Sequence, residues 1–559
     1  MSRKKDPILT GTALLTGSAI LVKIIGAGFK IPLANILGGV GMSYFATAYD
    51  IFSPLYTIAV TGLCIASSRL TAESLASHDG LEGAVFSASR KCFFTVGFLS
   101  SVLLILFCRP VAAALGNEGA GLPLAVIAPA LLFGCLASAY RGYFQGRSRM
   151  APTAKAQVVE ALFKLVFGIA GALLVFRYLD SGYESGTAPL WLLSRDERKA
   201  RLLILQLSAA GGVFGVTAGS LAGFLFLRRE YRREGKLLCR EKSAPGVFAK
   251  LLRTALPIAA TSAAANLASL SDLSSVMNGL RRAVTENPAV FLQQYAGLTP
   301  PEVSLMEIPE YLYGCYSGLC MSLFNLAPAL SAGIGLSAVP VLSALCKKKN
   351  AGDDIKQSLR SVLRTTAVIA FPLGLGISSA PEEILRFLYP EKTMEAMIAV
   401  PLLRAMGLIS VLTALSSVLG NVLQALGKEK IPLIAMITGG CMKLAVNYIL
   451  VSDPRFNIRG VLFGTGACYL VTLTFAAAAL LKSGFRARNF SVLLFPAEAS
   501  LICVIIVRKL SRALLPALGF PAAFILSAAV AGGIYLLMTV SSIFFKKREN
   551  ILCFLRGKT

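Results

Sequence analysis

Long apolar stretches recur from one end of the chain to the other, separated by polar connections. Crossing the roughly 30 Å hydrocarbon core of a bilayer takes about 20 residues of α-helix. Fourteen stretches reach that length, near residues 8–37, 42–72, 84–114, 122–145, 153–177, 201–227, 251–279, 311–345, 360–386, 395–426, 431–451, 459–481, 489–510 and 520–545. The pattern predicts an all-α polytopic membrane protein with about 14 transmembrane helices.

Composition and charge fit this prediction. Hydrophobic residues make up 55% of the chain and charged residues 15%, against about 25% charged in soluble proteins. The net charge of +26 would suggest a nucleic-acid partner in a soluble protein. Here most lysines and arginines lie on alternate connections, and the densest run is at 228–242. This asymmetry predicts that both termini lie in the cytoplasm, and it argues against nucleic-acid binding.

Two pairs of similar segments indicate an internal duplication. RGYFQGRSRMAPTAKAQVVEALFKLVFGI resembles GNVLQALGKEKIPLIAMITGGCMKLAVNYI, and FSPLYTIAVTGL resembles NLAPALSAGIGL. Both matches map helices one to six onto helices seven to twelve in the same orientation. We therefore predict an N-lobe at 1–228, a basic cytoplasmic linker at 229–250, a C-lobe at 251–482, and two further helices with a basic cytoplasmic tail at 483–559.

Charged residues inside the predicted spans are the main candidates for function. A charge at the membrane centre costs roughly 2.5 to 3.5 kcal/mol, so it usually faces a polar interior, a partner or a ligand. Lys23 and Lys30 share one helical face and are interpreted as diphosphate ligands. Alternatively, Lys30 reaches the outer interface and Lys23 pairs with a carboxylate. Asp50 lies at the depth of Lys30, so it forms either a structural pair or part of a gate.

Other intramembrane charges are placed by the same reasoning. Asp272 lies in a polar span that ends at Arg282, and we expect it to face the interior. Glu160 and Lys164 are four residues apart, which favours a structural pair within one helix. Lys443 has no carboxylate nearby in its own helix. The substrate-binding candidates are Lys23, Lys30, Asp50, Asp272, Arg282 and Lys443, and the secondary candidates are Glu160, Lys164 and Arg404.

Motifs for enzymatic chemistry are missing from the sequence. There is no nucleotide-binding GxxxxGK[ST] loop and no HExxH zinc motif, and the one histidine, His78, falls in a predicted cytoplasmic connection. The twelve cysteines are scattered without metal-like spacing. We predict no catalytic residues, no metal and no cofactor.

Several stretches carry a resemblance to a known family. GTALLTGSAILVKIIGAGFKIPLANILGGVGMSYF, YTIAVTGLCIASSRLTAES, RGYFQGRSRMAPTAKAQVVEALFK and VLGNVLQALGKEKIPL occur in the family's order. They resemble the polysaccharide transporter, or stage V sporulation protein B-like, family of the multidrug/oligosaccharidyl-lipid/polysaccharide (MOP) exporter superfamily, which is related to the MurJ lipid II flippases. The resemblance implies two six-helix lobes around a central cavity, two C-terminal helices beside a groove for a polyprenyl tail, and alternating access.

The resemblance also implies roles for particular residues. Lys23 and Lys30 occupy helix-one positions where the family often has arginine for the diphosphate. Asp272 and Arg282 match an Asp and an Arg late in helix seven, and polar family positions in helices five and eleven match Glu160, Lys164 and Lys443. Helix two departs from the family, because it has Asp50 and no mid-span arginine.

The predicted function is a flippase that moves an undecaprenyl-diphosphate-linked saccharide or a lipid II-like peptidoglycan precursor. Its location would be a bacterial plasma membrane and its partners that lipid and other membrane lipids, with cell-wall synthesis enzymes as an open alternative. Two alternatives stay open: a cation-coupled multidrug exporter of the same superfamily, and a non-transport scaffold for wall synthesis. A basic interior favours phosphate cargo, whereas an acidic, aromatic interior favours drugs.

Overall fold

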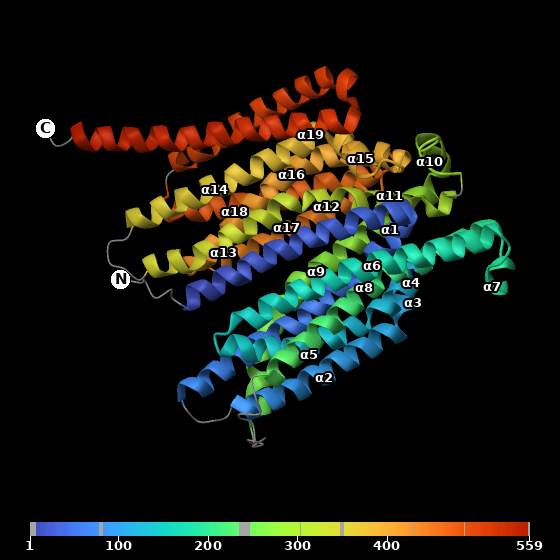
Figure 1. Ribbon diagram of the computed structural model, residues 1–559, viewed down its shortest axis with the longest axis horizontal. Coiled ribbons are helices and arrows are strands. Elements are labelled where there is room, and N and C mark those ends of the chain that lie inside the picture. The colour runs from blue at the N-terminus through green and yellow to red at the C-terminus, as the bar shows by residue number, and fades with distance from the viewer. Residues whose placement is uncertain are drawn as a thin grey trace. The chain divides into compact units, whose positions relative to one another are not determined.

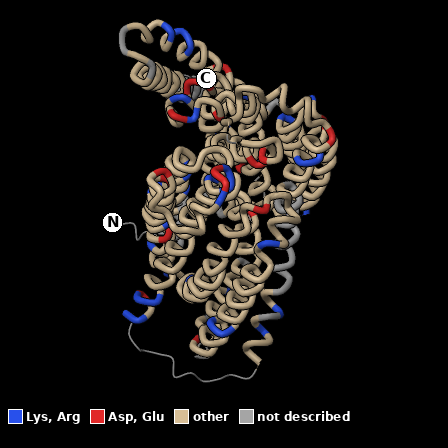
Figure 2. The backbone as a smooth tube through the Cα atoms, turned by 90° about the vertical axis from the view of Figure 1, so that its right-hand side faces the viewer, with Lys and Arg blue, Asp and Glu red and all other residues tan. Residues whose placement is uncertain are grey.

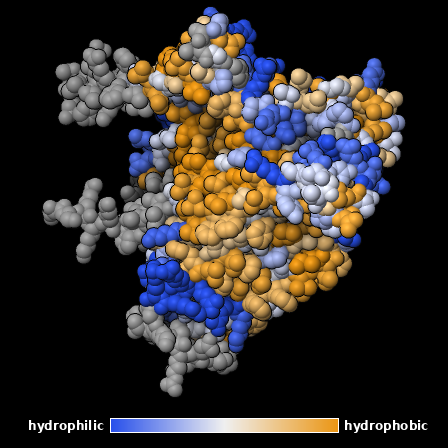
Figure 3. Space-filling model, turned by 45° about the vertical axis from the view of Figure 1, so that its right-hand side comes forward, coloured by the Kyte–Doolittle hydropathy of each residue, from blue (hydrophilic) through white to orange (hydrophobic). Residues whose placement is uncertain are grey.

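The computed structural model describes residues 7–77, 82–233, 246–301, 303–346, 352–428, 430–485 and 487–556 (Figure 1). Regular secondary structure in these ranges is helical, with no β-strand. Figure 2 shows that charged residues occupy only a small part of the helical backbone, and Figure 3 shows broad hydrophobic areas bordered by hydrophilic patches. The predicted all-α fold is confirmed.

Twelve helices in the described chain are long and apolar enough to cross a membrane. The first of them, Ile20–Leu75, contains two of the predicted spans. The seventh predicted span falls in α9 (Val247–Glu286), where the side chains of 256–272 lie outside the described residues. When both spans of Ile20–Leu75 and the span in α9 are counted, each of the fourteen predicted spans corresponds to helical structure. The protein is a multi-pass membrane protein.

The chain divides into two units, Met1–Ser322 with Gly440–Gly464, and Leu323–Gly439 with Thr465–Thr559. The predicted lobes and linker remain a prediction. The first unit contains α1 (Pro7–Ser77), α2 (Glu82–Leu106), α3 (Cys108–Ala114), α4 (Gly121–Ile127), α5 (Pro129–Gly146), α6 (Met150–Glu184), α7 (Leu190–Leu193), α8 (Glu197–Arg233), α9, α10 (Pro288–Gln294), α11 (Ile308–Gly314) and a π-helix (Cys315–Cys320).

The second unit contains α13 (Leu326–Cys346), α14 (Gly352–Ser379), α15 (Pro381–Leu388), α16 (Thr393–Ala425) and α19 (Leu494–Arg556), while α12 (Met321–Phe324), α17 (Lys430–Leu450) and α18 (Gly460–Lys482) contribute to both units. Close backbone contact joins α14 to α16, because a Cβ on Gly407 would lie 2.6 Å from the Gly374 carbonyl oxygen. In α19 the two predicted spans meet at Gly519, whose φ is 71°. Glycine adopts such a positive φ without the steric cost that a Cβ imposes.

A glycine corner also gives α1 its shape. Gly38 has φ 63° and ψ −170°, outside the helical range, and separates the two predicted spans of this continuous element. Across the corner, the ring centroids of Phe29 and Phe45 are 5.8 Å apart. The two halves of α1 therefore lie against each other and bring distant side chains together.

Helices α6 and α8 are joined by close glycine contacts. A Cβ on Gly171 would lie 2.7 Å from the Gly211 carbonyl oxygen, and a Cβ on Gly215 would lie 2.4 Å from the Gly168 backbone. Small residues allow such close helix approach in membranes. Figure 1 shows the two helices side by side, and α6 is thereby held in one position along α8.

Candidate functional site

Three lysines and two aromatic rings gather where α1 meets α6. The Lys164 ammonium lies 4.4 Å from the centre of the Tyr49 ring and 5.2 Å from that of Phe29. The Lys30 ammonium lies 5.9 Å from the Tyr49 ring centre. Such cation–π contacts contribute about 2 kcal/mol when the charge is desolvated. The rings hold two ammonium groups close together without neutralising either.

Lys23 and Asp50 complete this group, which we call the lysine cluster: Lys23, Lys30, Lys164, Tyr49 and Asp50. Lys23 is exposed and lies two turns before Lys30, within its electrostatic range. Asp50 also acts electrostatically on Lys30. The cluster thus has three cationic side chains and one carboxylate.

The Asp50 carboxylate is held by a residue of α11. The Tyr313 hydroxyl donates a hydrogen bond to Asp50 Oδ2 at 2.8 Å. This contact ties α1 to α11 beside a close backbone contact, since a Cβ on Gly314 would lie 1.6 Å from the Gly39 carbonyl oxygen. Asp50 therefore connects the lysine cluster to the start of the π-helix.

An aromatic ladder runs along the second half of α1. Phe45 stacks on Tyr49 at 6.0 Å, Phe52 follows at 6.2 Å, and Tyr56 lies 5.4 Å from Phe52. The spacing of four, three and four residues keeps these rings on one helical face. The aromatic ladder therefore extends from the lysine cluster toward α5.

Glu160 is paired with an arginine that the sequence interpretation did not consider. The guanidinium of Arg141, on α5, donates to Glu160 Oε2 at 2.7 Å and to the Tyr56 hydroxyl at 3.3 Å. Both side chains are largely buried, with 11% of Arg141 and 27% of Glu160 exposed. The predicted pairing of Glu160 with Lys164 is therefore wrong, because an interhelical partner holds the carboxylate.

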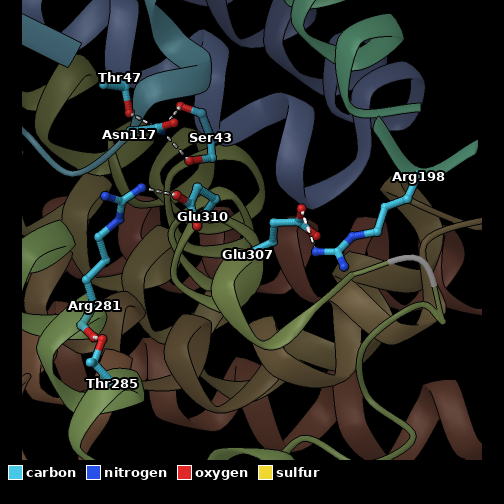
Figure 4. Close-up of polar contacts among 8 residues, drawn as sticks. All are labelled: Ser43, Thr47, Asn117, Arg198, Arg281, Thr285, Glu307 and Glu310. Carbon is cyan, nitrogen blue, oxygen red and sulfur yellow. Dashed lines mark hydrogen bonds and ion pairs between the residues drawn. The ribbon is translucent and has the colours of Figure 1, made fainter. Parts of the chain in front are cut away.

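A second polar group lies around the Gly38 corner (Figure 4). The Asn117 amide donates at 2.8 Å to Ser43 Oγ and at 2.8 Å to Thr47 Oγ1, both on α1. Figure 4 shows the amide between these two hydroxyls. The three side chains are buried and fix the connection after α3 against α1.

Two ion pairs involve the segment that begins α11. Arg281, on α9, donates to Glu310 on α11 at 2.9 Å, and the Glu310 carboxylate is buried. Arg198, at the start of α8, donates to Glu307 at 3.0 Å. Figure 4 shows both guanidinium groups turned toward carboxylates of the segment that begins α11. Charged contacts thus hold this segment to α8 and α9.

Arg282 and Lys443 lie on α9 and α17. Arg282 is exposed and donates to the Tyr448 hydroxyl at 2.9 Å, with its guanidinium 5.3 Å from the Tyr448 ring centre. Lys443 is half-buried, and one turn later Asn447 donates to Ser275 Oγ at 3.5 Å. The contacts of Arg282 and Asn447 thus join α9 to α17.

The last two candidates are not part of the lysine cluster. The side chain of Asp272 lies outside the described residues, so its predicted role stays a prediction. Arg404 is exposed on α16 in the second unit. Within the described residues, no group of three His, Cys, Asp or Glu side chains could hold a metal ion.

Sequence reasoning missed the aromatic and hydrogen-bonding members of the site. Tyr49, Tyr313 and Arg141 were not among the candidates, although they contact Lys164, Asp50 and Glu160 respectively. The ladder spacing in YFATAYDIFSPLY was a readable signal for Tyr49. No comparable signal marks Tyr313 or Arg141, since their partners are distant in sequence.

Two family models match the chain. The model described as polysaccharide biosynthesis protein covers residues 8–346, and the MatE model covers residues 317–449. The chain is 24% identical to stage V sporulation protein B of Bacillus subtilis (strain 168) over 486 residues, which is 85% of this chain and 83% of that protein. It is 21% identical to the lipid II flippase MurJ of the same organism over 490 residues, which is 84% and 81% of the two chains.

Solved structures share the fold. A lipid II flippase MurJ in an inward closed conformation has a TM-score of 0.64 at 15% identity, covering 96% of this chain and 99% of its own. A multidrug resistance MATE transporter of the MOP superfamily, in an inward-facing conformation, has a TM-score of 0.59 at 13% identity, covering 86% and 98%. At these identities the likeness concerns the arrangement of helices.

Proposed function

Because the chain belongs to the polysaccharide biosynthesis protein family, a branch of the MOP exporter superfamily, we propose that it is a flippase for a polyprenyl-diphosphate-linked saccharide. It moves the head group from the cytoplasmic to the outer leaflet of the plasma membrane by alternating access, with both chain termini in the cytoplasm. The names of its relatives, a lipid II flippase and a sporulation protein, support a peptidoglycan precursor as the cargo.

The observation that carries the proposal is the net positive charge of the lysine cluster. Lys23, Lys30 and Lys164 are set against one carboxylate, Asp50, which already accepts a hydrogen bond from Tyr313. Keeping several cations inside a membrane bundle is costly unless an anion compensates them. A diphosphate supplies that compensation, because lysine binds phosphate as a mobile point charge.

Each member of the lysine cluster has a distinct role in this proposal. Lys30 and Lys164 both bind the diphosphate, and the Tyr49 ring makes a cation–π contact with each of the two ammonium groups. Lys23, being exposed, meets the anion first. The Asp50 carboxylate attracts Lys30 and accepts a hydrogen bond from the Tyr313 hydroxyl on α11. An arriving diphosphate competes with Asp50 for Lys30, which weakens the attraction between Asp50 and Lys30 and favours movement of α11.

The membrane potential supplies a driving force for this direction of transport. With the inside negative, moving one negative charge outward gains about 2.3 kcal/mol per 100 mV. The lysine cluster stays with the protein when the diphosphate is released on the outer side, so the released lipid carries its negative charge outward. Coupling to an ion gradient is therefore not required for export.

The aromatic ladder favours a second candidate, a cation-coupled drug exporter. The rings of Phe45, Tyr49, Phe52 and Tyr56 offer stacking surfaces to flat organic cations. Two lysines already occupy the face of Tyr49, however, and they repel such cations. The sign of the cluster thus favours the flippase.

Translocation of lipid-linked precursor in reconstituted vesicles tests the proposal. The intact chain is compared with Lys30→Gln and Lys164→Gln, and with Lys155→Gln as a matched control on an exposed part of α6. A lost charged hydrogen bond costs about 1.5 to 3 kcal/mol, so each cluster variant should slow translocation roughly tenfold or more. Lys155→Gln should transport like the intact chain.

Two outcomes would count against the flippase. One is that both cluster variants translocate the precursor at the rate of the intact chain. The other is that the purified protein moves no precursor yet expels cationic dyes against a sodium or proton gradient, which would establish the drug exporter. An equal rate in vesicles without protein would exclude transport by this chain.

A further inference from the structure

The last two turns of α8 present four arginines on one face. Arg228, Arg229, Arg232 and Arg233 line a hollow of about 320 Å³ together with Leu225. Their spacing of three and four residues places them on one side of the helix. All four arginines are exposed. We call this surface the arginine face.

The arginine face has little negative charge around it. Arg233 donates to Glu230 at 3.1 Å, whereas Arg228, Arg229 and Arg232 have no ion pair within the described chain. Like charges four residues apart each destabilise a helix by roughly 0.2 to 0.5 kcal/mol. The face therefore favours any anion that reaches several guanidinium groups at once.

Aromatic packing behind the helix fixes the direction of these arginines. Tyr231, on the opposite side of α8, stacks on Phe86 at 4.6 Å and contacts Tyr143 edge-on at 5.1 Å. This cluster buries one side of the helix end against α2 and α5. The arginines consequently point outward.

An apolar strip continues the arginine face along α8 toward the membrane interior. Phe214 and Leu225 are each 48% exposed, with half-buried Leu221 between them, while neighbouring Val213 and Val216 are buried. The eleven residue steps from Phe214 to Leu225 rise about 16 Å, close to the thickness of one leaflet, about 15 Å. The surface thus combines a cationic end with an apolar strip one leaflet deep.

We propose that this surface binds an anionic glycerophospholipid, with its phosphate on the arginine face and one acyl chain along Phe214, Leu221 and Leu225. Guanidinium groups bind phosphate oxygens through two parallel hydrogen bonds, which gives arginine an advantage over lysine at such a site. A lipid fits better than a soluble phosphate because Leu225 lines the hollow and also belongs to the apolar strip. The single-leaflet depth fits an acyl chain better than a long polyprenyl chain.

Native mass spectrometry of the purified full chain tests this site. The protein is offered diphosphatidylglycerol, phosphatidylglycerol, phosphatidylcholine, a polyprenyl diphosphate or inorganic pyrophosphate. Each arginine near anionic lipid contributes about fivefold in affinity, so R228Q/R229Q/R232Q should bind diphosphatidylglycerol roughly 100-fold more weakly. R177Q/R195Q/K199Q, which removes three exposed cations elsewhere in the same unit, should bind like the intact chain.

A triple lysine variant, R228K/R229K/R232K, separates charge from arginine geometry and should retain intermediate affinity. Equal lipid binding by the intact chain and R228Q/R229Q/R232Q would overturn the proposal. It would also fail if pyrophosphate or the polyprenyl diphosphate displaced the phospholipid at lower concentration than competing phospholipid does. Circular dichroism confirms that each variant is folded. The measurement involves no translocation, so failure of the proposed function would leave this result unaffected.

Discussion

The buried pair between Arg141 and Glu160 leads to a quantitative prediction about stability. Removing one partner of a buried ion pair costs roughly 3 to 5 kcal/mol, because the other charge is left uncompensated. Arg141 is 11% exposed and Glu160 27% exposed, so water reaches the carboxylate better than the guanidinium. We therefore expect Glu160→Met, which strands the more buried Arg141, to cost more than Arg141→Met.

Removing both partners should cost much less than either single change. Arg141→Met with Glu160→Met leaves apolar side chains of similar volume and no stranded charge, a change that is often neutral or stabilising. Tyr56 then loses only the 3.3 Å contact with the guanidinium. The expected order of stability is intact chain close to the double variant, then Arg141→Met, then Glu160→Met.

Reversible unfolding in mixed detergent micelles measures these free energies and completes the double-mutant cycle. The same assay tests the rejected pairing: Glu160→Met and Lys164→Met should be additive within about 0.5 kcal/mol. Two results would refute the reasoning: a double variant as unstable as the sum of its singles, or strong coupling between Glu160 and Lys164.

Three further predictions concern other contacts. Gly314→Ala should lower the yield of monodisperse protein, because its Cβ would lie 1.6 Å from the Gly39 carbonyl oxygen, while Gly376→Ala has open space and should have little effect. Asn117→Ala should reduce the free energy of unfolding by about 1 to 3 kcal/mol, since its two 2.8 Å hydrogen bonds are buried. Burial raises the pKa of the Tyr295 phenol above its ordinary value. The stability that the protonated phenol confers is therefore present below about pH 10 and is lost as the pH rises above that value. Tyr295→Phe should reduce this alkaline loss in a pH titration of unfolding.

These three predictions fail under distinct results. Normal yield and a normal unfolding midpoint for Gly314→Ala would contradict the close contact of α1 and α11. An unchanged midpoint for Asn117→Ala would mean that its hydroxyl partners find equal substitutes. Identical pH profiles for the intact chain and Tyr295→Phe would show that the phenol does not titrate differently in the folded protein.

Hydropathy was sufficient to predict the helices because the bilayer imposes one length and one polarity on every span. It could not predict that Gly38 would join two spans into a continuous element, since the turn depends on one residue with positive φ. The pairing of Glu160 illustrates a second limit. Spacing along one helix favoured Lys164, but Arg141, 19 residues earlier, reaches the carboxylate from another helix.

Charge patterns along the sequence predicted only part of the lysine cluster. Counting residues placed Lys30 and Asp50 at about the same depth and Lys23 nearer the membrane centre, and in the structure both Asp50 and Lys23 act electrostatically on Lys30. The contact of the Tyr49 ring with both Lys30 and Lys164 depends on the packing of α6 against α1, which no local pattern encodes. Partners within one helix are readable from a sequence, whereas partners across helices require the fold.

The glycine contacts between α6 and α8 make a mechanical link between the two proposed binding sites. Lys164 lies on α6 beside the contact of Gly215, whose Cβ would lie 2.7 Å from the Lys164 carbonyl oxygen. Backbones this close cannot slide past each other without losing contact, so we expect the two helices to move together. On the two proposals above, a displacement of Lys164 by a diphosphate would move the arginine face with it, and a phospholipid bound at that face would oppose this movement.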